Sequence, residues 1–338
     1  MTLSVISNQS NNTCFPIFHW NETTISTKRP QLDVCFIATI THSVLWLQLM
    51  FCPTVRQKTM QWIYAYLATD ILLLVRFYFT FIVHMTSYEC KTNTIWFYFV
   101  FYVEAAADNY LNTLEIYIIL ALNICRYAQI AWNKNVYITH MKSLILAHVA
   151  IYSAPLISLI IQIITNWAQL NIYVGESCDI GYTNIYSQVF NTITAFILPI
   201  ILNIIVIGVS TRHIHLTSQL KGGQHHISAR EKYHRSLVIQ FFVFYTIWLS
   251  LWSPNIIVYQ FTSGSSVLTQ IVVLLNYIEI ALDPIIISAL DVRFYQAWKK
   301  LWTDVKNKSL RRFHIEQGRI LPTTVANTLQ TMQQRTMP

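Results

Sequence analysis

Seven long apolar stretches limit what this chain can fold into. Of its 338 residues, 54% are hydrophobic and only 11% are charged. The hydrophobic residues gather in blocks of about 20 or more, the length at which a helix crosses the roughly 30 Å hydrocarbon core of a bilayer. The blocks lie at residues 33–54, 60–84, 96–127, 143–166, 186–211, 233–261 and 266–290.

Other membrane architectures fit the sequence poorly. Strands of a transmembrane β-barrel alternate apolar and polar residues, and the sequence has no such two-residue period. It also lacks an internal repeat and the matching broken helices of transporters. We therefore predict an all-α membrane protein with a seven-transmembrane-helix bundle.

The bundle is expected to divide the chain into three parts. Residues 1–32 form an extracellular segment, and residues 33–303 form the membrane domain. That domain ends in a short amphipathic helix, which is indicated by Phe294, Trp298, Leu301 and Trp302. Residues 304–338 form a disordered cytoplasmic tail.

The basic residues predict the orientation of the bundle. Lys and Arg are enriched in the short loops and flanks that face the cytoplasm. With the N-terminus outside, 19 of the 23 basic residues fall on the inner side. The net charge of +8 then reflects this bias and contact with anionic membrane lipids, so it does not indicate nucleic-acid binding. We predict a multi-pass protein of the plasma membrane.

The predicted outer segments contain modification signals. Three glycosylation sequons begin at Asn8, Asn11 and Asn21. Cys90 and Cys178 fall in outer loops on the oxidising side of the membrane, where they could form a disulfide. Both signals are consistent with an extracellular N-terminus.

Six of the 15 acidic residues lie within the predicted spans. Each ionised carboxylate at mid-bilayer costs about 2.5–3.5 kcal/mol, so these side chains must face the bundle interior, pair with a base or hold protons. The six are Asp70, Glu104, Asp108, Glu115, Glu279 and Asp283. An acid at this depth is a candidate functional residue by default.

Helix geometry predicts which of these groups meet. Asp108 and Arg126 lie roughly 27 Å apart along one helix face, with Glu115 near the same stripe. Four acids fall at one mid-membrane depth, namely Asp70, Glu115, Glu279 and Asp283. They cannot all be ionised in a dry site, so we expect either shared protons or a bound hard cation such as sodium or calcium.

Arg76 leaves two interpretations open at the outer level. It lies roughly 9 Å above Asp70, and Asp108 lies roughly 10 Å above Glu115, so Arg76 and Asp108 can meet. A pair would be a structural charge match. An unpaired Asp108 would instead anchor a cationic ligand.

Five short motifs occur in order along the predicted helices. They are Leu67-Ala68-Thr69-Asp70, Cys125-Arg126-Tyr127, Pro199, Trp252-Ser253-Pro254 and Asp283-Pro284. Each is similar to the motif of the corresponding helix in the rhodopsin-like (class A) G-protein-coupled receptors, and the resemblance covers most of residues 33–303. A single motif of this kind is weak, but five in the expected order are specific.

The resemblance implies roles at the inner end of the bundle. Arg126 and Tyr127 would form the switch that engages a heterotrimeric G protein after the sixth helix swings outward. Pro254 and Pro284 each remove a backbone hydrogen bond and would kink or loosen their helices. The four mid-membrane acids coincide with the sodium-pocket positions of the family.

The resemblance also implies an outer pocket for an extracellular amine or peptide. Asp108 lies where amine receptors bind the ammonium group of their ligand, and Trp252 would sense the ligand one turn below. The other implied pocket residues are Arg76, Asn112, Asn191, Asn255, Tyr259 and Tyr277. No lysine occurs between Lys232 and Lys299, so we expect no retinal and no other organic cofactor.

Departures from the family pattern bear on signalling. Cys125 replaces the acid that normally precedes the switch arginine, and this removes its local restraint. Ile207 and Ile287 replace the two activation tyrosines, and helix 1 has His42 or Ser43 near the place of its usual Asn. We therefore expect either raised basal activity or a receptor that signals by another route.

Two other functions remain open. The membrane acids would suit a cation- or proton-conducting bundle, and the missing tyrosines would suit a non-signalling, receptor-like binding protein. An enzyme is not expected, because the sequence has no nucleophile–base set, metal-ligand Cys/His spacing or phosphate loop.

Overall fold

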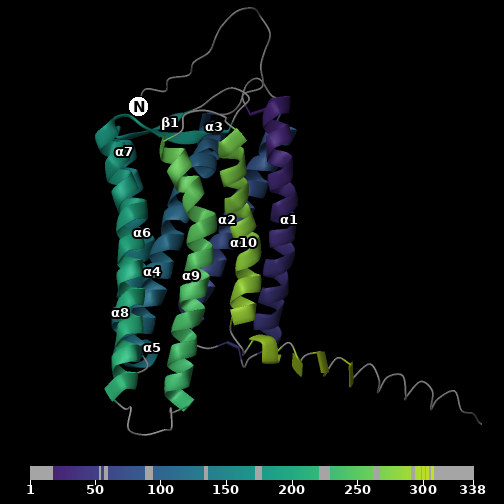
Figure 1. Ribbon diagram of the computed structural model, residues 1–338. Helices are drawn as coiled ribbons and strands as arrows, with labels where there is room; N and C mark the ends of the chain where they lie inside the picture. Colours follow the sequence, from purple (N-terminus) through teal and green to yellow (C-terminus); the bar gives the residue numbers. More distant parts are fainter. Residues whose placement is uncertain are drawn as a thin grey trace, which may run out of the picture.

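Helices make up most of the structure (Figure 1). The computed structural model describes residues 18–52, 55–56, 60–87, 94–132, 136–171, 177–220, 229–261, 267–290, 294–297, 299–300, 302–303 and 306–307. The helices are α1 (Glu22–Phe51), α2 (Gln61–Thr86), α3 (Thr94–Phe101), η2 (Tyr102–Ala106), α4 (Ala107–Trp132), α5 (Val136–Thr139), α6 (Met141–Ile164), α7 (Ile185–Thr192), η3 (Ile193–Ile197), α8 (Leu198–Leu220), α9 (Ala229–Phe261) and α10 (Val267–Leu290). The strands β1 (Ala168–Asn171) and β2 (Asp179–Tyr182) form an antiparallel hairpin.

Long apolar helices make this chain an all-α, multi-pass membrane protein. Among the described residues, six helical segments are long and apolar enough to cross a bilayer. They are Glu22–Phe51, Gln61–Thr86, Thr94–Trp132, Met141–Ile164, Ile185–Leu216 and Leu268–Leu290. α9 packs against both α8 and α10 (Figure 1). Many apolar side chains on the outside of the bundle are exposed, as expected for residues that face lipid.

The first helix begins earlier than the sequence predicts. Asn21 caps it, because its side chain accepts a hydrogen bond from the backbone N–H of Thr24 at 2.7 Å. The helix then continues through Pro30 to Phe51. Residues 22–32, which the sequence assigns to the extracellular segment, are helical and continuous with the first apolar stretch, and their position outside the membrane stays a prediction.

α4 is the central helix of the bundle. It packs against α2, α6 and α8, while α10 packs against α1 and α9. Glu115 and Arg126 are buried on α4, with 0% and 5% of their surface exposed. The stripe predicted along this helix therefore faces the protein interior, and α2 and α10 supply its neighbours.

One end of the bundle is covered by a hydrophobic cap. We call it the hairpin end, because β1 and β2 lie there, and we call the opposite end the α5 end (Figure 1). Phe18 packs with Phe101, Cys178 and Ile180 in a buried cluster at the hairpin end. Phe18, just before α1, thus packs against the bundle together with the hairpin.

Candidate functional site

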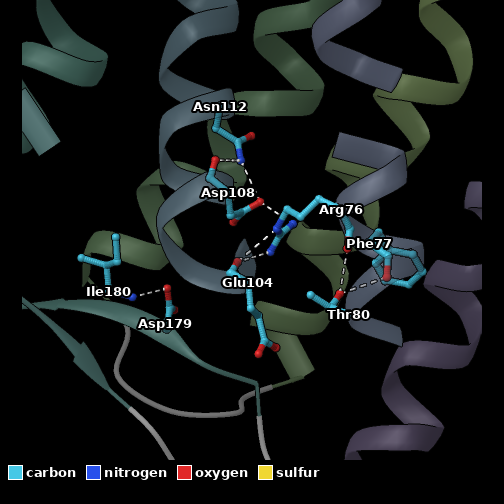
Figure 2. Close-up of polar contacts among 8 residues, drawn as sticks. All are labelled: Arg76, Phe77, Thr80, Glu104, Asp108, Asn112, Asp179 and Ile180. Carbon is cyan, nitrogen blue, oxygen red and sulfur yellow. Dashed lines mark hydrogen bonds and ion pairs between the residues drawn. The ribbon is translucent and has the colours of Figure 1, made fainter. Parts of the chain in front are cut away.

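An ion pair joins α2 to α4 near the hairpin end. Arg76 Nη1 lies 2.6 Å from Asp108 Oδ1, and Asn112 donates a hydrogen bond to the same oxygen at 3.1 Å (Figure 2). Arg76 also donates from Nε and Nη2 to the carbonyl oxygen of Glu104, at 3.0 and 2.8 Å. The structure therefore agrees with the first interpretation, in which Arg76 and Asp108 form an ion pair. Asp108 is not a free anchor for an ammonium group.

A π-helical turn allows Glu104 and Asp108, four residues apart, to contact different partners. In η2 the backbone hydrogen bonds span five residues, and the N–H of Ala107 bonds to the carbonyl of Tyr102. In a regular helix, residues four apart share a face. Here Asp108 points at Arg76, whereas the Glu104 carboxylate is turned away from it (Figure 2).

Glu104 ties the chain before α1 to the bundle through His84. Its Oε2 lies 3.0 Å from His84 Nε2, and His84 Nδ1 lies 2.5 Å from the carbonyl oxygen of Phe18. Trp20 stacks on the imidazole with ring centroids 4.4 Å apart. A carbonyl oxygen only accepts, so Nδ1 has a proton, and one further proton is shared between Nε2 and the carboxyl group.

Midway along the bundle, Tyr66 joins the two acids of α10. Its hydroxyl contacts Glu279 Oε1 at 2.6 Å and also contacts Asp283 Oδ2. A hydroxyl donates only one hydrogen bond, so the second contact requires a proton on one of the two carboxyl groups. Both acids are 1% exposed. The three side chains therefore form a proton-sharing group.

Asp70 and Glu115 form a second acid pair at this depth. Both are completely buried, and each carboxyl group acts on the other. Beyond this mutual contact, the described residues offer their four oxygens no other hydrogen-bond donor. His42 Nε2 lies 3.7 Å from Asp70 Oδ2 and 3.1 Å from the carbonyl oxygen of Ile280. His42 thus links α1 to α2 and α10, near the place where the resemblance implies an Asn.

The four mid-membrane acids differ in their direct contacts. Tyr66 contacts Glu279 and Asp283, whereas Asp70 and Glu115 face each other. In the part of the chain that the structure describes, no group of three or more His, Cys, Asp or Glu side chains could hold a metal ion. The charges of the two acid pairs nevertheless act on each other, and the sodium site predicted among these four acids stays a prediction.

Arg126 lies at the α5 end, beneath α9. Its Cζ atom is 5.0 Å from the ring centroid of Phe241, and its Nη2 lies 3.8 Å from Met60 Sδ. A small cavity of about 40 Å³ beside it is also lined by Ile287 and Leu290 of α10. Arg126 is thus enclosed by side chains from α2, α9 and α10.

The neighbours of Arg126 differ from the family pattern. The thiol of Cys125 interacts with Trp62 and Tyr137 as well as with the charge of Arg126. Tyr127 is half-buried. Pro254 and Pro284 lie inside α9 and α10, and both helices continue through them.

The residues predicted to line the outer pocket do not all meet. Tyr277 is a hydrogen-bonding neighbour of Arg76. Asn191 instead lines a cavity that includes neither Asp108 nor Asn112. Trp252 is buried, and Asn255 is half-buried. The side chain of Tyr259 lies outside the described residues.

The predicted modification sites are described only in part. Cys178 is a buried free thiol and Cys90 lies outside the described residues, so the structure gives no support to a bridge between them. Asn8 and Asn11 also lie outside the described residues. Asn21 is exposed, although its side-chain oxygen caps α1.

Tyr66, His42 and His84 are the polar partners that sequence reasoning missed or left without a role. Tyr66 lies four residues before Asp70, so it shares a face of α2 with that acid, and this spacing was a usable signal. His84 had no such signal, because its partners come from α4's neighbour η2 and from the chain before α1.

Comparisons with known proteins give no indication of function, so the function is inferred from the sequence and the geometry of the site. No protein-family model and no curated protein matches the chain. The site itself is a series of buried polar groups at three levels of one bundle, joined across α2, α4 and α10.

We predict that Arg76→Gln lowers stability more than Asp108→Asn. Arg76 loses its ion pair and two hydrogen bonds to Glu104, which corresponds to about 1–3 kcal/mol. The Asp108 side chain is 41% exposed, so its loss should cost less than about 1 kcal/mol. Thermal unfolding of the purified protein in detergent measures both. Equal losses would show that the bonds to Glu104 contribute nothing.

We also predict that Tyr66→Phe destabilises the protein by about 1–3 kcal/mol, because two buried carboxyl groups lose their shared hydroxyl. Tyr78→Phe is the matched control, since the Tyr78 hydroxyl contacts the hydroxyl of Thr39 at an exposed position. The control should change stability by less than about 0.5 kcal/mol. If the two variants unfold at the same temperature, Tyr66 does not bridge the acids.

Proposed function

We propose that this chain is a plasma-membrane receptor of the rhodopsin-like, G-protein-coupled class. α9 would be a seventh span, and the hairpin end would face outward, as the distribution of Lys and Arg predicts. The five ordered motifs and the buried polar stripe support this proposal together. A ligand would act by shifting the population between two helix packings.

The enclosure of Arg126 is the observation on which the proposal mainly rests. Phe241 of α9 covers the guanidinium group, and Ile287 and Leu290 of α10 line the small cavity beside it. Outward movement of the α5 end of α9 would remove this cover and expose Arg126 to a cytoplasmic partner. Pro254 in the same helix removes one backbone hydrogen bond and so eases bending.

A stack of aromatic rings runs along the middle of α9. Trp252 lies 5.8 Å from Phe196 and 4.7 Å from Trp248, measured between ring centroids. Trp248 in turn lies 5.9 Å from Tyr245, one turn after Phe241. Because close-packed rings cannot move independently, a ligand that displaces Trp252 would shift this side of α9 as a unit.

The ion pair bears on the chemistry of the ligand. Asp108 already binds Arg76, so an amine would have to displace a guanidinium group that three hydrogen-bond contacts hold in place. A peptide can instead engage the pair with a backbone carbonyl and an N–H together. Of the two ligand classes, the geometry supports a peptide better.

We predict that the purified protein stimulates nucleotide exchange on a heterotrimeric G protein without added ligand, because Cys125 provides no acidic restraint on Arg126. Arg126→Ala should abolish this exchange. Arg56→Ala is the matched control, since Arg56 is exposed in the connection between α1 and α2, and it should leave exchange unchanged. A panel covering the main G-protein classes is required. If no member of the panel responds, the chain is a non-signalling binding protein.

A conducting bundle is the alternative that the two buried acid pairs favour. It predicts whole-cell proton or cation currents that Glu115→Gln abolishes. On the receptor proposal, cells expressing the protein show no such current, while Glu115→Gln changes basal nucleotide exchange. Currents sensitive to Glu115→Gln, without any exchange activity, would replace the receptor with a channel.

A further inference from the structure

A cavity lies on the flank of the bundle, apart from the acid stripe. It has a volume of about 400 Å³ and lies between α4, α6 and the α7–η3 segment. Asn109, Gln162 and Asn191 contribute polar groups to it, and none of its lining residues is charged. A mostly apolar space of this size with a few polar groups is typical of a small-molecule site.

Irregular backbone in two helices accompanies this cavity. Pro155 lies inside α6 and cannot donate a hydrogen bond to the carbonyl of Ile151, and both residues line the cavity. On the facing side, Thr194 and Ala195 belong to the π-helical turn η3. Helix irregularities of this kind are frequent at functional sites.

Gln162 lines this cavity and has an unpaired, buried acceptor. Its side chain is 4% exposed, and its Nε2 donates to Ser158 Oγ at 3.2 Å. Its Oε1 is buried, and among the described residues no hydrogen bond reaches it. A buried acceptor without a donor is unfavourable, so a ligand that donates a hydrogen bond here would be stabilised.

The two tyrosines of the cavity cannot serve as donors to a ligand. Tyr110 donates its hydroxyl proton to the carbonyl oxygen of Tyr152 at 3.0 Å, and Tyr117 donates to that of Thr194 at 2.6 Å. Their rings therefore form apolar walls. The hydrogen bond that a ligand can complete at Gln162 is one in which the ligand is the donor.

The helices on both sides of the cavity face lipid. On α6, Ile157 and Ile160 are about half exposed, and on the α7–η3 side the same holds for Val189 and Ile193. Such apolar surfaces lie against acyl chains in a bilayer. A molecule dissolved in the bilayer therefore meets this flank directly.

We propose that this cavity binds an uncharged, largely apolar bilayer molecule whose hydroxyl group donates to Gln162 Oε1. The uncharged lining disfavours ionic headgroups, because a buried charge requires a partner. Sterols and diacylglycerols share the required chemistry. Binding at this site does not depend on signalling, so the test of this proposal is independent of the receptor proposal.

The test uses the full chain in phosphatidylcholine vesicles with a photoreactive cholesterol probe, and mass spectrometry maps the labelled residues. Gln162→Met keeps the length of the side chain and removes the acceptor. We expect labelling on α6 to fall about fivefold, the value of one hydrogen bond. A probe with its hydroxyl methylated should label the wild type as weakly as the hydroxyl probe labels the variant.

Two further variants make the result specific. Gln48→Met also removes a buried glutamine with an unpaired Oε1, but on α1, and it should leave α6 labelling unchanged. Ala195→Phe fills the cavity from the facing wall and should abolish labelling by both probes. Competition by unlabelled cholesterol or by dioleoylglycerol identifies the source of the hydroxyl. Equal labelling by the two probes, or full labelling of Gln162→Met in a protein that unfolds at the wild-type temperature, would overturn the proposal.

Discussion

Inside a bilayer, each polar group must find its partner within the protein, because lipid offers neither hydrogen bonds nor counter-charges. This constraint explains why the acids of the spans occur in pairs. Asp108 binds Arg76, Glu104 binds His84, and Tyr66 joins the two acids of α10. Each of these contacts crosses between segments, so the same groups that are costly to bury also fix how the helices pack.

The helices themselves could be predicted from sequence, because a run of about 20 apolar residues leaves a chain few alternatives. Their ends could not. α1 begins at the Asn21 cap and passes through Pro30, whereas Lys28, Arg29 and Pro30 look like a boundary in the sequence. The Asn21 cap favours a helix start before these residues, and a hydropathy profile does not detect a capping side chain.

The sequence predicted the depth of the acidic residues in the bundle, but not which side chains they contact. Helix rise places Asp70, Glu115 and the acids of α10 at one level, and all four are buried there. Pairing depends on how the helices are rotated about their axes, and η2 and η3 each change that rotation by an extra residue in one turn. Glu104 and Asp108 consequently have different partners, and Asn191 lines another cavity.

α10 connects the three polar levels. Tyr277 lies beside Arg76 near the hairpin end, Glu279 and Asp283 meet Tyr66 midway, and Ile287 borders the cavity of Arg126. α2 contributes to the same levels through Arg76, Tyr66 and Met60. Any relative shift of α2 and α10 must therefore alter all three levels together. Because the middle level contains a shared proton, such a shift would be coupled to protonation as well as to whatever binds at the Arg76–Asp108 pair.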